Sequence, residues 1–170
     1  MKSYTKSEVS NFSGLTPRMV QYYVDEGLVI PDVSNPSGRG HVRRFSFNNI
    51  LECAIISNIY KLGVVTKTIL SILSVLKLKL DISDAYRRHI ASVIKRNTFV
   101  CIHNDSAHKK PDSDDVVLNI FFDDARVCEI ALVSTNLVLN LSYIFNLVDI
   151  RIYREGTIGQ ERRHNEKPQE

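Results

Sequence analysis

Residues 4–29, YTKSEVSNFSGLTPRMVQYYVDEGLV, contain the signals for two short helices separated by a tight turn. The Thr5 hydroxyl can accept a hydrogen bond from the backbone amide of Glu8, and the Glu8 carboxylate can accept one from the amide of Thr5. This reciprocal capping box predicts that a helix starts at Thr5 and runs to Ser13. Gly14 can adopt the left-handed conformation that ends such a helix.

A second helix is predicted to begin at Thr16 and Pro17, because threonine is a good N-cap and proline is favoured at the first helical position. Gly27 is expected to end it. Two short helices joined by a turn that contains glycine are typical of a helix-turn-helix. The apolar residues whose spacing lets them pack between the helices are Val9, Phe12, Leu15, Val20 and Val24.

The segment VIPDVSNPSGRGHVRRF, residues 29–45, predicts a β-ribbon with its turn at 37–40, because prolines, glycines and Asn-Pro cluster there. We interpret it as a wing. Residues 39, 41 and 43 alternate onto one face of such a ribbon, and that face should meet a phosphate backbone. The alternative is a solvated surface ribbon. The basic residues of the wing are Arg39, His41, Arg43 and Arg44.

Two further helices complete a predicted N-terminal head. Ser46 should cap a helix that runs through Lys61 and stops at Gly63, and Thr66 should start another over residues 67–80. Apolar residues recur at helical spacing in both. We therefore expect four helices around one small core, with the wing beside them.

Beyond residue 81 the pattern changes to an α+β one. We expect a helix at 84–96, strands at 98–102, 116–122, 127–133 and 137–141, and a final helix capped by Ser142 and ending near Glu155. The predicted fold class is thus α+β, a four-helix winged helix-turn-helix followed by a small antiparallel sheet with flanking helices. The predicted domains are a DNA-binding domain at 1–80, a dimerisation or effector domain at 81–155 and a flexible tail at 156–170.

Charge is unevenly spread along the 170 residues. Residues 1–80 hold ten Lys or Arg against five Asp or Glu, whereas residues 81–170 hold twelve against fourteen. A basic head on a mildly acidic body is typical of a nucleic-acid-binding module joined to a second part.

Other classes of protein find little support in the sequence. The three cysteines, Cys53, Cys101 and Cys128, have no CxxC or CxxH spacing, and the N-terminus lacks a signal-peptide pattern, so we expect a cytoplasmic protein with reduced, buried thiols. The uncharged stretch 130–148 includes six polar residues, which favours a buried strand and helix over a membrane span. We expect no cofactor and no metal. Zinc ligation by His103, Asp105 and His108 is the alternative, and it lacks a fourth ligand.

Three stretches together resemble the DNA-binding domain of the MerR family: residues 4–29, the wing and following helix start GRGHVRRFSFNNILE, and IYKLGVVTKTILSIL at 59–73. The order and spacing of the motif residues Thr16, Arg18, Tyr22, Tyr23, Asp25, Gly27 and Leu28 agree with the family pattern. The chain departs from that pattern in two places. Gln21 stands where the family usually has Arg, and the wing has Gly-Arg rather than Gly-Tyr-Arg.

A helix that enters the major groove, with cations beside it for the phosphates, is what DNA recognition requires. Arg18 and Gln21 lie near the start of the second helix, where Arg can pair with guanine and Gln with adenine; for Gln21 the alternative is simple solvent exposure. Tyr22 and Tyr23 can donate hydroxyls to phosphates, and one of them, Tyr22 rather than Tyr23, is expected to be partly packed in the core. The resemblance adds Lys61 as a basic residue that approaches DNA.

The resemblance implies a homodimer that binds double-stranded promoter DNA, distorts it and contacts RNA polymerase. A long dimerisation helix is not evident directly after the head. We therefore expect the dimer contact on the final helix, with Ile144, Leu147, Val148 and Ile152 on one side, or on the sheet. No catalytic motif is present, so we expect no enzyme. The alternatives are a DNA-binding architectural or chromosome or plasmid segregation protein, and a protein-interaction module with a borrowed head.

Overall fold

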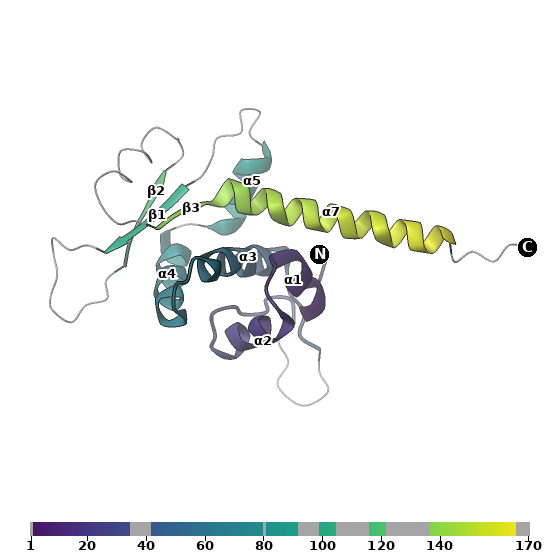
Figure 1. Ribbon diagram of the computed structural model, residues 1–170, viewed down its shortest axis with the longest axis horizontal. Helices are drawn as coiled ribbons and strands as arrows, with labels where there is room; N and C mark the ends of the chain where they lie inside the picture. The colour runs from purple at the N-terminus through teal and green to yellow at the C-terminus, as the bar shows by residue number, and fades with distance from the viewer. Residues whose placement is uncertain are drawn as a thin grey trace, which may run out of the picture.

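The computed structural model describes residues 2–34, 42–79, 81–91, 99–104, 116–121 and 137–165. Helices and one small sheet make up this part of the chain in an α+β arrangement. Figure 1 shows the sheet at one end and the second half of the last helix extending beyond the others at the opposite end. The elements are α1 (Lys6–Ser13), α2 (Pro17–Asp25), α3 (Phe47–Lys61), α4 (Thr66–Lys79), α5 (Ile82–Ala91), β1 (Phe99–Asn104), β2 (Val116–Phe121), β3 (Leu137–Asn140) and α7 (Leu141–Asn165).

The predicted boundaries of α1 and α2 are confirmed, because each depends on a local cap. The amide of Glu8 donates to the Thr5 hydroxyl at 3.3 Å, and the amide of Thr5 donates to the Glu8 carboxylate at 2.7 Å. Gly14 ends α1 with a φ of 79°, a conformation that a side chain would disfavour. The Thr16 hydroxyl accepts from the amide of Met19 at 3.2 Å and so caps α2.

Helix α3 is the central element of the head, and its length follows the prediction from Ser46 to Lys61. Its buried residues lie all round the helix rather than on one face, since α1, α4, α5 and α7 all pack against it. One continuous hydrophobic cluster extends from Tyr4 in the head to Val148 in α7. The head and the last helix therefore share one core.

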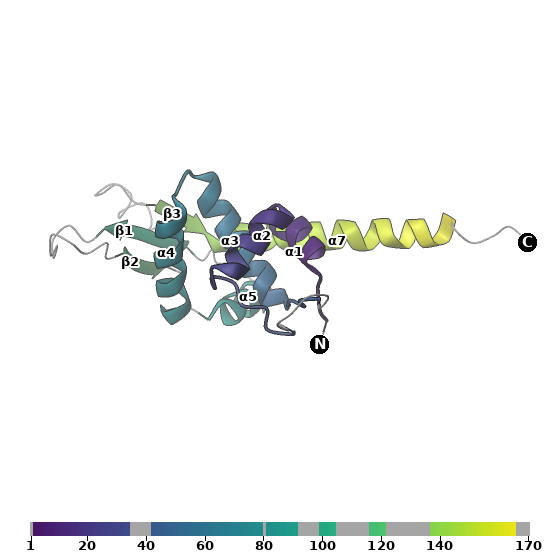
Figure 2. The same ribbon diagram turned by 90° about the horizontal axis from the view of Figure 1, so that it is seen from below.

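The three strands form an antiparallel sheet in the order β2-β1-β3, with Val100 of β1 opposite Ile120 of β2 and Leu139 of β3. The sheet packs against α4 through β2 (Figure 2). The strand expected at 127–133 lies outside the described residues.

Helix α7 follows β3 without a loop, and both ends of it differ from the prediction. The N-cap is Asn140, whose side-chain oxygen accepts from the amide of Tyr143 at 2.9 Å, whereas Ser142 is buried inside the first turn. The helix was predicted to end near Glu155 and to be followed by a flexible tail from residue 156. This prediction is wrong, because the helix continues to Asn165. Once the packed first half has formed the helix, each added residue gains a backbone hydrogen bond, and Glu and Arg in the second half are good helix formers.

The side of α7 that we expected to form a dimer packs instead against its own chain. Ile144 and Val148 are buried in the shared core, as is Phe145, and Ile152 is partly buried there. The predicted dimer face is therefore wrong, because it packs on the apolar surface of the head within the same chain and is not accessible to a second copy.

Polar contacts also join α7 to the end of α1. The Arg151 guanidinium donates to the carbonyl of Phe12 at 2.9 Å, and Asn11 donates to the Glu155 carboxylate at 3.0 Å. A Cβ at Gly14 would lie 2.9 Å from the same guanidinium, so Gly14 also leaves room for the approach of α7. Helix α7 thus holds the turn that precedes α2.

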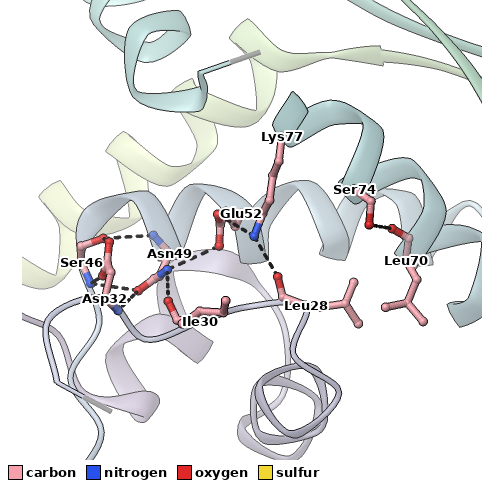
Figure 3. Close-up of polar contacts among 9 residues, drawn as sticks. All are labelled: Leu28, Ile30, Asp32, Ser46, Asn49, Glu52, Leu70, Ser74 and Lys77. Carbon is pink, nitrogen blue, oxygen red and sulfur yellow. Dashed lines mark hydrogen bonds and ion pairs between the residues drawn. The ribbon is translucent and has the colours of Figure 1, made fainter. Parts of the chain in front are cut away.

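The chain that leaves α2 is held by α3 and α4 through a partly buried polar network (Figure 3). The Lys77 ammonium donates to the carbonyl of Leu28 at 3.0 Å and pairs with the Glu52 carboxylate at 3.0 Å. The Asn49 amide donates to the carbonyl of Ile30 at 3.0 Å, and Asp32 accepts from the Ser46 hydroxyl at 2.6 Å. These contacts fix the start of the wing relative to α2.

Within this network, burial raises the pKa of the Glu52 carboxyl even though Lys77 and Asn49 act to lower it. A carboxyl whose pKa is higher in the folded than in the unfolded chain binds more protons when folded, so its contribution to stability grows as the pH falls. We therefore expect the stability of wild type relative to Glu52→Gln to increase from pH 7 toward the ordinary glutamate value of 4.5. Urea unfolding of both proteins at pH 7 and about pH 5 measures this difference. Parallel changes in the two proteins would contradict it.

Candidate nucleic-acid interface

One face of α2 is left free by the packing of the head. Val20, Tyr23 and Val24 are turned into the core, so the opposite positions face outward. These outward positions are Arg18 and the residues three, four and seven positions after it, which share one side of the helix. We call this side the α2 face; it consists of Arg18, Gln21, Tyr22 and Asp25.

The start of α2 exposes the residues that we predicted to contact bases. Thr16 uses its hydroxyl for the cap, and Pro17 follows at the first helical position. Arg18 is exposed in this first turn and Gln21 is half-buried one turn later. The N-terminal turn of a recognition helix is the part that reaches base edges in the major groove.

The tyrosine pair is correctly divided into one packed and one exposed residue, but in the opposite order from our prediction. Tyr22 is 45% exposed, whereas Tyr23 is 1% exposed and burial raises the pKa of its hydroxyl. Tyr23 lies three residues after Val20 and next to Val24, on the side of α2 that faces the core. The proposed contact with DNA is therefore withdrawn for Tyr23 and kept for Tyr22.

The base of the wing is described on both sides, while its tip at 35–41 lies outside the described residues, together with Arg39 and His41. Ser34 and Arg44 exchange backbone hydrogen bonds of 3.1 and 2.8 Å as an antiparallel bridge. Arg44 is exposed. Arg43 turns toward α2, and its guanidinium lies 3.1 Å from the Asp25 carboxylate.

Arg43 belongs to a chain of polar contacts that crosses the α2 face. The Lys6 ammonium donates to the Gln21 side-chain oxygen at 3.2 Å, and the Gln21 amide donates to Asp25 at 2.8 Å. Hydrogen bonds from Gln21 and Arg43 hold the pKa of the Asp25 carboxyl below its usual range. Three elements, α1, α2 and the wing, thus meet at one exposed surface.

Two members of this surface were not among the predicted site residues. Asp25 was noted only as part of the family pattern, and its four-residue spacing from Gln21 was the available signal. Lys6 gave no such signal, because its position beside Gln21 depends on how α1 packs on α2. Lys61, which was predicted, is exposed at the end of α3, and no described hydrogen bond or ion pair joins it to the surface.

The described residues include one buried free thiol, no candidate metal site and no helix of membrane-spanning length and apolarity. Cys53 is a buried free thiol whose pKa is raised by burial; Cys101 lies in β1, and Cys128 is not among the described residues. In the described ranges, no three His, Cys, Asp or Glu residues are grouped so that they could hold a metal ion. Of the helices described, none is long and apolar enough to cross a membrane.

Two short helices around a glycine turn, the second of them with one exposed face, define the N-terminal part of this chain as a helix-turn-helix domain. A comparison with family models agrees. Residues 4–75 match the model described as MerR HTH family regulatory protein. The match supports an N-terminal helix-turn-helix domain of the MerR family. A comparison with curated proteins finds no match.

Proposed function

We propose that this protein is a sequence-specific DNA-binding transcription regulator. The observation that carries the proposal is the outward α2 face of a MerR-type domain, with Arg18, Gln21 and Tyr22 free of the core and Arg43 beside them in an ion pair with Asp25. In this proposal α2 enters the major groove. Arg18 and Gln21 contact base edges, and Tyr22 and the wing arginines contact phosphates.

The regulator acts as a homodimer in this proposal, through the side of α7 that its own chain leaves uncovered. Tyr143, Ile150 and Tyr153 are 57%, 48% and 77% exposed and lie seven and three residues apart, on one side of the helix. A stripe of this kind buries apolar surface when two copies meet. A dimer on α7 would present two α2 faces to two half-sites.

Regulation by a dimer of this kind works through the shape of the promoter. Bending or untwisting the DNA between promoter elements requires deformation energy, which the added protein contacts offset. Such a regulator acts in the cytoplasm, and RNA polymerase is its expected partner. No catalysed reaction is part of the proposal.

The proposal is tested by incubating the purified protein with fragmented genomic DNA and sequencing the bound fragments. We expect the bound fragments to share a pseudo-palindromic site near promoters. Sedimentation of the purified protein should show a dimer in solution. Dispersed fragments without a shared motif would favour the architectural or segregation protein instead. Absence of any bound fragment at low salt would contradict DNA binding altogether.

Arg43→Ala should lower the salt dependence of DNA binding if its guanidinium meets a phosphate. Each phosphate contact adds about one unit to the slope of log affinity against log salt concentration, so we expect the slope to decrease by about one. Arg87→Ala is the matched control, since Arg87 is exposed on α5, outside both the α2 face and the side of α7 proposed for the dimer. An unchanged slope in Arg43→Ala would contradict a contact between Arg43 and a phosphate.

A further inference from the structure

Asp25 is the one residue of the α2 face with a negative charge, and it accepts two hydrogen bonds at one oxygen. The Gln21 amide nitrogen lies 2.8 Å from its Oδ1, and the Arg43 guanidinium lies 3.1 Å from the same atom. On the other side, the Gln21 oxygen accepts from Lys6 at 3.2 Å. An acidic residue on a surface meant for DNA would repel phosphates, so its position there requires an explanation.

We propose that Asp25 is a positioning residue for DNA recognition, which orients the Gln21 amide toward a base and the Arg43 guanidinium toward a phosphate. The inference rests on the proposed function and deepens it. Glutamine recognises adenine with one N–H and one oxygen lone pair at the same time. An amide with fixed ends therefore distinguishes adenine from the other bases, whereas a freely rotating amide does so less well.

The contacts within the network leave enough hydrogen-bonding groups for DNA. The Gln21 amide has two N–H donors and two lone pairs, of which Asp25 and Lys6 use one each. One donor and one acceptor remain, which is the set that adenine requires. The Arg43 guanidinium has five N–H donors and gives one to Asp25, so several remain for a phosphate.

The net charge of this group of side chains and their fixed positions in the free protein both favour DNA binding. Lys6 and Arg43 outnumber Asp25, so the group as a whole stays positive toward a phosphate backbone. The free protein already holds two long side chains in place, which lowers the conformational entropy lost on binding. Asp25 contributes here by placing its neighbours rather than by touching DNA.

Glu26 provides the matched control for the charge alone. It follows Asp25 at the end of α2 and is also exposed to solvent, but no hydrogen bond or ion pair joins its carboxylate to another described side chain. Removing either carboxylate reduces the repulsion of phosphate by a similar amount. Only the removal of Asp25 releases Gln21 and Arg43. Both are exposed positions, where alanine is well tolerated in a helix.

The test uses the full chain and a pool of random-sequence DNA duplexes, from which wild type, Gln21→Ala, Asp25→Ala and Glu26→Ala each select their preferred sites. Gln21→Ala should lose the preference at one base pair in each half-site. Asp25→Ala should reduce the preference at the same base pair by about fivefold or more, because a well-made Gln–adenine pair discriminates at least that much. Glu26→Ala should keep the wild-type motif and bind all duplexes somewhat more tightly.

The outcomes distinguish a failure of the inference about Asp25 from a failure of the proposed DNA-binding function. If Asp25→Ala selects the same motif as Glu26→Ala, Asp25 acts only through its charge, and the inference is overturned while DNA binding stands. If Gln21→Ala keeps the full wild-type motif, Gln21 contacts no base, and the inference fails in the same way. A wild-type protein that enriches no motif at all would contradict the proposed function itself.

Discussion

Replacing Phe145 by alanine should lower the free energy of unfolding by about 3–5 kcal/mol, the usual result of removing a phenyl ring from a well-packed core. Phe145 is fully buried at the start of α7, and its ring packs edge-on against that of Tyr86 at 5.6 Å. The core that it fills is shared with α3 of the head. Chemical denaturation measured by circular dichroism gives the free energy directly.

Tyr143→Ala is the control for this change, because Tyr143 lies two residues earlier in α7 and is 57% exposed. Because Tyr143 belongs to the side of α7 proposed for the dimer, unfolding is measured at a protein concentration at which wild type is monomeric. Under this condition its removal should alter the free energy of unfolding by no more than about 0.5 kcal/mol. A loss below about 1 kcal/mol for Phe145→Ala would show that α7 does not pack on the head as described. The contrast between two aromatic residues of one helix thus measures which side of α7 is covered.

Replacing Lys77 by methionine should destabilise the protein by about 2–3 kcal/mol at pH 7, since it leaves a largely buried carboxylate without its partner. The side chain of Glu52 is only 15% exposed, and the Lys77 ammonium lies 3.0 Å from it. The same ammonium donates to the carbonyl of Leu28, so the chain after α2 loses a contact as well. The loss should become smaller at about pH 5, because protonation of Glu52 removes the unpaired charge.

Two further variants distinguish this cause from a general effect of losing a lysine. Lys61→Met makes the same change at an exposed position and should alter stability by no more than about 0.5 kcal/mol. The double variant Glu52→Leu with Lys77→Met should recover most of the loss, because it removes both charges together. A double variant as unstable as Lys77→Met would assign the effect to packing instead of charge.

The helices of the head could be predicted closely because their ends depend on nearby residues. Thr5, Thr16 and Ser46 each cap a helix by accepting from an amide three residues later, and the Gly14 and Gly63 backbones have the left-handed conformation that ends one. Such signals act within one turn of the chain, so the sequence alone is enough to recognise them.

The prediction that Tyr22 rather than Tyr23 is packed was wrong, although helical spacing in the sequence indicates the correct order. Val20 and Val24 were predicted to pack between the helices, and Tyr23 follows the first by three residues and precedes the second by one. Helical geometry puts these three residues on one side and Tyr22 on the other. The spacing from Val20 and Val24 therefore indicates Tyr23, and not Tyr22, as the packed residue.

Other features depend on contacts between distant parts of the chain. Lys6 meets Gln21 across 15 residues, and Arg43 meets Asp25 across 18. The covered side of α7 depends on α1 and α3, since Arg151 reaches Phe12 over 139 residues. A pattern in one helix shows that it has an apolar side, but only the packing determines what covers that side.

The central claim, that the α2 face recognises a specific DNA sequence, is tested most directly by competition for one labelled duplex that carries the selected motif. The protein is held at a single salt concentration, and unlabelled duplexes with the motif or with the same bases in scrambled order compete for it. We expect the scrambled duplex to require at least about 10³ times the concentration of the motif duplex for equal displacement. Equal displacement by both duplexes would contradict sequence-specific recognition.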